Sequence, residues 1–157
     1  MSEEEIGKRL ARNDLFAGLD PDEIQFLSGC AKHRHFAKDH VVFRHGDKAS
    51  SFFLIVSGTI SIEVPAISGP TLFLQHLDAG QMLGWSWMIP PYKWSFLARA
   101  ETDVEALEFD GVAVLARCEE DPKFGYHLLK AFSGLMSQRL AHARQRMMEE
   151  WQATGFG

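Results

Sequence analysis

The segment from Leu83 to Arg99, LGWSWMIPPYKWSFLAR, concentrates the side chains best suited to bind a small ligand. Its aromatic side chains can line a cleft for a flat apolar or aromatic molecule, or hold a cation against a π face. Alternatively, these aromatic side chains fill the cleft themselves, and the domain then binds no ligand. The candidate ligand-binding residues are Gly84, Trp85, Ser86, Trp87, Lys93, Trp94, Ser95 and Phe96.

The other titratable residues predict neither catalysis nor a metal site. His33 and His35 share a face if that segment is extended, but a His-x-His pair without a well-spaced third ligand is typical of solvated surface. Cys118 precedes three acidic residues, which predicts a raised thiol pKa and low reactivity. No GxSxG, P-loop, GxGxxG or HExxH motif occurs. We therefore expect no enzyme activity, no metal and no cofactor.

Composition narrows the class of protein. The chain has 157 residues, 46% of them hydrophobic, which fits a single domain, residues 1–157. A net charge of −5 with scattered Lys and Arg gives no basic surface for nucleic acid. Two cysteines without a CxxC motif favour a reducing cytoplasm. No long uncharged apolar stretch occurs, so we expect neither export nor membrane spanning.

Periodicity predicts a mainly β domain with flanking helices. Residues 1–30 show helical patterns, with Asp20-Pro21 starting a short helix. Residues 31–109 alternate short apolar strands with turns, which favours an antiparallel roll or barrel that includes residues 83–99. Residues 110–152 return to helix, with caps at Asp110 and Asp121. The predicted strands are Val41 to Phe43, Phe52 to Val56, Thr59 to Val64, Leu72 to Leu77, Phe96 to Ala100 and Val104 to Phe109.

The predicted long C-terminal helix carries one apolar stripe at three- and four-residue steps, and charged residues including Arg139 are expected on its other faces. Such a stripe needs a partner surface. It either packs on the chain's own barrel or, over its outer half, pairs with a second copy as a coiled coil. The predicted dimer residues are Leu129, Phe132, Met136, Ala143 and Met147.

Several motifs resemble the cyclic-nucleotide-binding domain of the Crp/Fnr superfamily. LFAGLDPDEIQFL resembles the family's opening helices, and VVFRHGDKASSFFLIVSGTISIEV resembles its hairpins, with Gly46, Asp47 and Gly58 at the turns. LDAGQMLG is similar to the loop before its phosphate-binding cassette. The resemblance covers Leu15 to Trp151 and implies a double-stranded β-helix, or jelly roll, followed by a long C-terminal helix.

The resemblance also implies where a cyclic nucleotide would bind. In the family, a Gly-Glu pair opens a short helix, and an Arg follows beside Ser or Thr and Ala; Glu binds the ribose, while Arg and the helix N-terminus hold the phosphate. Here Gly84 matches, but Trp85 stands at the Glu position, Trp94 at the Arg position and Phe96 at the Ala position. Losing such a charge-assisted contact costs about 2–5 kcal/mol, so cAMP and cGMP binding is disfavoured. An alignment shifted by one residue brings Lys93 into the Arg position and keeps a weakened nucleotide site.

Three functions follow from this resemblance. The first is a non-enzymatic sensor that binds a non-nucleotide small ligand and signals to a partner protein through its C-terminal helix. Backbone N–H groups at Ser86, Trp87 and Met88 and the hydroxyl of Ser95 would serve a carboxylate or other small anion in that case. The second is a ligand-free dimerisation or interaction module. The third is a genuine cAMP or cGMP receptor with an unusual cassette. The superfamily's transcription factors carry a DNA-binding helix-turn-helix after the long helix, and this sequence shows none.

Overall fold

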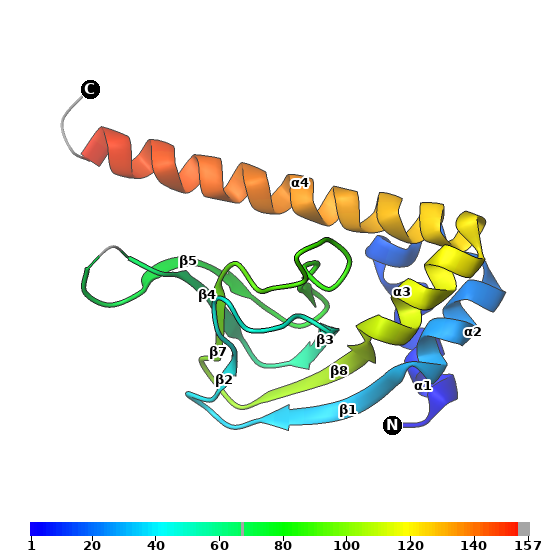
Figure 1. Ribbon diagram of the computed structural model, residues 1–157. Helices are drawn as coiled ribbons and strands as arrows, with labels where there is room; N and C mark the ends of the chain where they lie inside the picture. Colours follow the sequence, from blue (N-terminus) through cyan, green and yellow to red (C-terminus); the bar gives the residue numbers. More distant parts are fainter. Residues whose placement is uncertain (67, 154–157) are drawn as a thin grey trace.

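The structure is a computed structural model that describes residues 1–66 and 68–153. Two four-stranded antiparallel sheets form a β-roll, with the order β1-β8-β3-β6 in one sheet and β2-β7-β4-β5 in the other (Figure 1). This confirms the predicted jelly-roll fold. The strands are β1 (Ala31–Phe36), β2 (Val41–Phe43), β3 (Ser51–Ser57), β4 (Ile60–Val64), β5 (Leu72–Leu77), β6 (Met82–Leu83), β7 (Leu97–Ala100) and β8 (Val104–Asp110).

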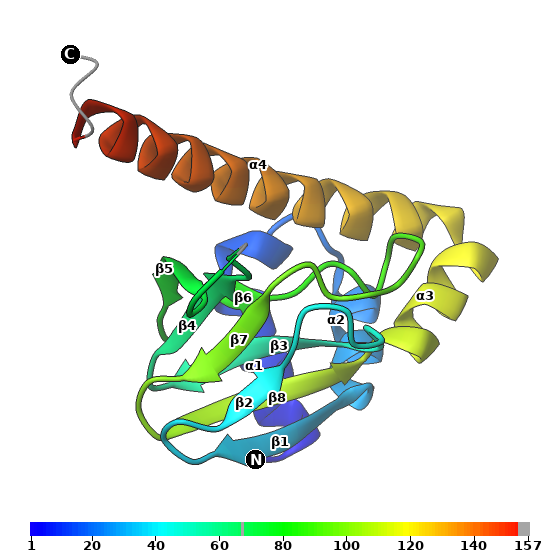
Figure 2. The same ribbon diagram turned by 60° about the vertical axis from the view of Figure 1, so that its left-hand side comes forward.

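The first helices gather at one end of the roll (Figure 1), whereas the last runs along its side toward β5 (Figure 2). Side chains that precede them accept hydrogen bonds from the free N–H groups of their first turns. Asp20 and Glu23 form a capping box, and Asp110 accepts from Val112 and Ala113. The elements are α1 (Glu3–Arg12), the 3₁₀ turn η1 (Asp14–Phe16), α2 (Pro21–Gly29), α3 (Gly111–Glu120) and α4 (Pro122–Ala153).

An aromatic cluster, Phe52, Trp87, Phe109 and Phe132, holds the roll and α4 together. Phe52 of β3 and Phe109 of β8 are register partners, and their rings stack with centroids 4.6 Å apart. Trp87 stacks on Phe52 at 4.7 Å, and Phe132 of α4 meets Trp87 edge-on at 5.4 Å. All four side chains are almost completely buried. Such pairs add about 0.5–1.5 kcal/mol beyond the burial of their area.

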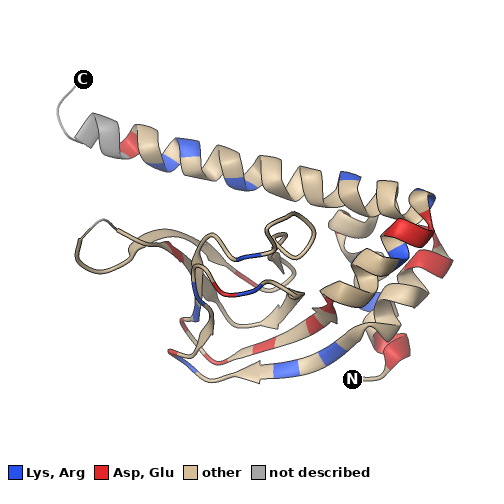
Figure 3. Cartoon of the chain, viewed as in Figure 1, with Lys and Arg blue, Asp and Glu red and all other residues tan. Residues whose placement is uncertain are grey.

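Two strands, β1 and β6, lie outside the six predicted segments. β1 has the polar sequence AKHRHF, and it pairs with β8 along its whole length. The basic side chains of Lys32 and Arg34 form ion pairs with Glu108 on β8. Figure 3 shows the basic positions of β1 in blue beside the acidic positions of β8 in red. β6 is only two residues long and pairs with β3. In both cases the partner strand, rather than an apolar alternation, sets the conformation.

α4 presents one face to the roll and another to solvent. Leu128, Phe132 and Leu135 are buried on the inner face, and His127 adds a contact to the buried Glu23 of α2, with Nδ1 2.8 Å from Oε1. Leu129 and Met147 lie exposed on the outer face, with 49% and 71% of their surface accessible. The placement of Phe132 in a dimer stripe was wrong, because its ring is fully buried within its own chain.

None of the helices within the described residues is long and apolar enough to cross a membrane.

Candidate functional site

The segment that follows β6 forms a turn instead of the short helix that the resemblance implies. Gly84 has a φ of +99°, a conformation that favours glycine. The indole N–H of Trp87 donates to the Gly84 carbonyl at 3.3 Å, and the N–H of Met88 donates to the Trp85 carbonyl at 3.0 Å. The expected helix N-terminus at Ser86, Trp87 and Met88 is therefore not formed, and the N–H group of Met88 is already used within the turn.

Trp94 occupies the space directly above Gly84. Its N–H donates to the Asp47 carbonyl at 2.9 Å, and its own carbonyl accepts from Gly46 at 2.8 Å, which fixes the backbone on both sides of the residue. The indole stacks flat on Phe43 with centroids 3.7 Å apart, and only 4% of its surface is accessible. A Cβ atom built on Gly84 would lie 2.6 Å from Cη2 of Trp94. No room is left between this indole and the backbone of Gly84.

The remaining predicted site residues divide into a buried and an exposed group. Phe96 is buried next to Trp94 and Trp85, with ring centroids 6.3 Å and 6.1 Å away. Ser86 is buried as well. Lys93 and Ser95 are exposed on either side of Trp94. The structure therefore buries the side chain of Trp94 and leaves that of Lys93 exposed outside the roll.

The predicted residues do not share one of the described cavities. Trp87 borders a cavity beside α3, together with Tyr92 and Leu115. Trp94 borders a different and smaller one, of about 210 Å³, together with Phe43 and Glu108. The aromatic side chains of the segment therefore pack mainly against one another and against the core.

Sequence reasoning missed Arg139, which was expected on a solvated face of the last helix. Arg139 is only 9% exposed, donates a hydrogen bond to the Met82 carbonyl of β6, and lies with its Cζ atom 5.6 Å from the centre of a Trp85 ring. Burial lowers the pKa of its guanidinium to about 10. Its spacing from Leu128, Phe132 and Leu135, in steps of four, three and four residues, was the available signal.

The two histidines considered for a metal site bind a carboxylate. His33 Nε2 lies 2.6 Å from Oε2 of Glu105, and His35 Nδ1 lies 2.8 Å from Oε1 of the same residue. The three residues lie on the neighbouring strands β1 and β8. Among the residues that the structure describes, no group of three or more His, Cys, Asp and Glu side chains is placed to hold a metal ion.

Cys118 is expected to react slowly with thiol reagents. Burial, followed by the charges of Glu119 and Asp121, raises the pKa of this thiol from 9.0 to about 11. The thiolate is the reactive species, so its fraction at pH 8 is roughly 100-fold lower than in the unfolded chain. A Cys30→Ser variant treated with iodoacetamide isolates Cys118. Its alkylation rate should rise about tenfold per pH unit between pH 8 and 10; a fast, pH-independent rate would contradict the shift.

The geometry defines the class of protein by its architecture, a β-roll with a loop cassette between β6 and β7 and a long helix packed over it. Comparisons with known proteins identify the family. Residues 33–121 match the model of the cyclic nucleotide-binding domain, which is more than half of the chain. The chain belongs to the cyclic nucleotide-binding domain family, a non-catalytic, small-molecule-sensing fold.

Individual relatives are more distant. A CRP-like cAMP-activated global transcriptional regulator from Mycobacterium tuberculosis is 26% identical over 124 residues, which are 79% of this chain and 55% of the regulator. A cAMP-dependent protein kinase regulatory subunit from Candida albicans is 32% identical over 62 residues, 40% of this chain and 14% of the subunit. The chain thus spans about half the length of the first relative and a small part of the second.

Solved structures share the fold. A cyclic nucleotide-binding domain from Methylobacillus flagellatus superposes with a TM-score of 0.79 at 19% identity, covering 94% of this chain and 83% of that one. The sensor domain of the transcriptional regulator DNR from Pseudomonas aeruginosa superposes with a TM-score of 0.72 at 21% identity, covering 88% and 93%.

Proposed function

We propose that this chain is a regulatory domain whose cassette is filled by its own aromatic side chains and does not take up a cyclic nucleotide. The supporting observation is the buried Trp94 indole, stacked on Phe43 and lying against Gly84. A phosphate at that place would meet an apolar ring where family members carry an arginine. Burying a phosphate without a cationic partner is unfavourable by several kcal/mol.

A cytoplasmic location of this protein stays a prediction.

α4 is the element that would report a change in the cassette. Trp87 of the cassette packs against Phe132 of α4, and Arg139 of α4 lies with its Cζ atom 5.6 Å from the centre of the Trp85 ring. A shift of the turn at residues 85–88 therefore disturbs two contacts with the same helix. A ligand or partner that favours one arrangement of this turn would move α4 relative to the roll.

The proposal is tested by titrating the purified protein with cAMP and cGMP. Trp85, Trp87 and Trp94 lie in the cassette, so tryptophan fluorescence reports directly on its occupancy, and calorimetry provides an independent measurement of binding. We expect neither signal to saturate with either nucleotide. A saturable change in both signals would overturn the proposal and make the chain a cyclic-nucleotide receptor, the activity implied by the name of its Mycobacterium relative.

We further propose that α4 forms a homodimer through its outer face. The exposed and half-buried positions of this face follow a strict alternation of three and four residues, the spacing of a coiled-coil seam. Leu140 at its centre has 62% of its surface accessible. Compared with the predicted dimer residues, this outer face lacks Phe132 and additionally contains Tyr126, Ser133 and Leu140. The outer face consists of Tyr126, Leu129, Ser133, Met136, Leu140, Ala143 and Met147.

The dimer is tested with Leu140→Glu, which places a charge in the middle of the outer face. We expect the wild-type protein to sediment as a dimer and this variant to dissociate at least roughly 30-fold more readily, because an interface hot spot contributes about 2 kcal/mol or more. Gln145→Glu adds the same charge at an exposed position off the outer face and should leave the dimer intact. A wild-type monomer, or equal effects of both variants, would contradict the assignment.

A further inference from the structure

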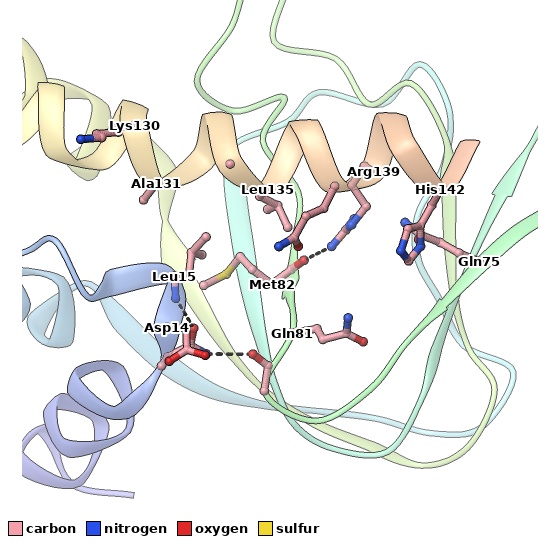
Figure 4. Close-up of a pocket in the computed structure, with 14 residues that line it drawn as sticks. Asp14, Leu15, Gln75, Gln81, Met82, Lys130, Ala131, Leu135, Arg139 and His142 are labelled. Carbon is pink, nitrogen blue, oxygen red and sulfur yellow. Dashed lines mark hydrogen bonds between the residues drawn. The ribbon is translucent and has the colours of Figure 1, made fainter. Parts of the chain in front are cut away.

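A cavity of about 400 Å³ lies outside the roll, between α4, η1 and the turn that leads into β6 (Figure 4). Its volume is in the range of small-molecule sites, about 300–1,000 Å³. Leu15, Met82 and Leu135 give it an apolar wall, and Gln75, Gln81 and Arg139 bring polar groups to it. Neither Gly84 nor Trp94 borders this cavity, so it is separate from the cassette.

Arg139 brings a buried positive charge to the cavity without a matching negative one. A guanidinium carries five N–H donors, and the hydrogen bond found for Arg139 uses one of them, toward the Met82 carbonyl. Among the described residues, no carboxylate forms an ion pair with it. The nitrogen atoms of Arg139 that have no hydrogen-bond partner are accessible to solvent, so their N–H donors can reach a ligand. A buried charge of this kind is stabilised by a counter-ion.

Two glutamine side chains line the same cavity as Arg139, and the oxygen atom of each accepts a hydrogen bond. Nδ1 of His142 lies 2.7 Å from Oε1 of Gln75 and donates to it, because an amide oxygen only accepts. The backbone N–H of Asp78 donates to Oε1 of Gln81 at 2.7 Å. The hydrogen bonds found for these two amides leave their NH₂ groups unused, and N–H donors suit an anion. The carboxylate of the cavity, Asp14, lies beside Leu15 and away from Arg139 (Figure 4).

We propose that this cavity binds a small organic carboxylate, with its anionic group on Arg139 and the two glutamine amides and its apolar body against Leu15, Met82 and Leu135. The carboxylate forms charge-assisted hydrogen bonds with the guanidinium, which are stronger than its present bond to a neutral carbonyl. This site goes beyond the proposed function and does not depend on whether the cassette is filled. It also gives α4 a direct link to a ligand, because Arg139 belongs to that helix.

The test uses benzoate and inorganic phosphate as probes, at constant ionic strength with chloride as the reference. We expect benzoate to bind saturably by calorimetry, and phosphate, which lacks an apolar body, to bind at least about tenfold more weakly. Arg139→Gln removes the charge and leaves a polar amide in its place, and should weaken benzoate binding by about tenfold or more. Arg144→Gln removes the same charge from an exposed position of the same helix and should have no effect.

A measurement on the unmodified protein covers the case in which Arg139→Gln does not fold. The Nε–H signal of a buried arginine is observable by NMR, and that of Arg139 should shift progressively as benzoate is added. The proposal is overturned if benzoate does not bind, if both arginine variants bind it equally, if phosphate binds as tightly as benzoate, or if the Arg139 signal does not move. A nucleotide titration that succeeds at the cassette would overturn the proposed function and leave this site unaffected.

Discussion

Replacing Trp85 by Glu and Trp94 by Arg in the same chain should create cAMP binding that the wild-type protein lacks. The two substitutions supply the ribose acceptor and the phosphate cation that the family resemblance places at these positions, and removing the indole of Trp94 frees the space above Gly84. Each contact of this kind contributes about 2–5 kcal/mol. We therefore expect calorimetry to show an affinity for cAMP that is higher by roughly 100-fold or more.

The control for this experiment is Lys93→Arg, which adds an arginine guanidinium one residue away, at an exposed position. It should not bind cAMP, because its side chain lies outside the roll. Binding by this variant would support the alignment in which residue 93 takes the arginine position. The double variant is expected to melt at a lower temperature than the wild type and to be stabilised by cAMP, since a ligand that binds only the folded state raises the melting temperature. A folded double variant that does not bind cAMP would contradict the assignment of residues 85 and 94.

Gly84→Ala should destabilise the protein strongly, and more so in the presence of Trp94 than in its absence. The new methyl group would lie 2.6 Å from Cη2 of the indole, and the φ of +99° is strained for any residue with a side chain. Strain of this type costs about 1–3 kcal/mol. The clash adds an overpacking cost of about 1–3 kcal/mol, which a Trp94→Leu background should largely remove.

Urea denaturation of the wild type, both single variants and the double variant measures this coupling as a double-mutant cycle. Gly80→Ala is the matched control, because Gly80 has a similar φ of +87° but no atom within 4 Å of the position of its added Cβ. Its cost should be the same with and without Trp94. If Gly84→Ala were also independent of Trp94, the indole would not lie against Gly84, and the proposed filling of the cassette would lose its main support.

The two links between the cassette and α4 suggest how a ligand in the cavity outside the roll would affect the cassette. Trp85 lies in the cassette and also under the guanidinium of Arg139, which borders the cavity outside the roll. A carboxylate that draws Arg139 away from the Met82 carbonyl would change the surroundings of Trp85 at the same time. Under this proposal the cavity and the cassette turn would be coupled through one arginine, and such a coupling is reciprocal by thermodynamic necessity.

Local sequence determined most of the elements of this protein. The predicted strand Leu72 to Leu77 has the observed bounds, and Val104 to Phe109 is short of the observed strand by one residue. Asp20 and Asp110 mark the starts of α2 and α3 through hydrogen bonds to N–H groups two or three residues away. These features depend on alternation and capping, which act between near neighbours and are therefore visible in the sequence alone.

Tertiary structure decided which face of each element is buried. β1 has no apolar alternation, and its strand conformation comes from β8, about seventy residues away in the sequence. α4 carries apolar residues on two faces, so the sequence did not reveal that Phe132 and Arg139 face the roll while Leu140 faces solvent. Trp94 likewise acquired its position from Phe43, which belongs to a different strand far earlier in the sequence and stacks on its indole. The physical reason is that burial depends on which remote segment covers a side chain, and a single sequence specifies the side chain but not the segment that covers it.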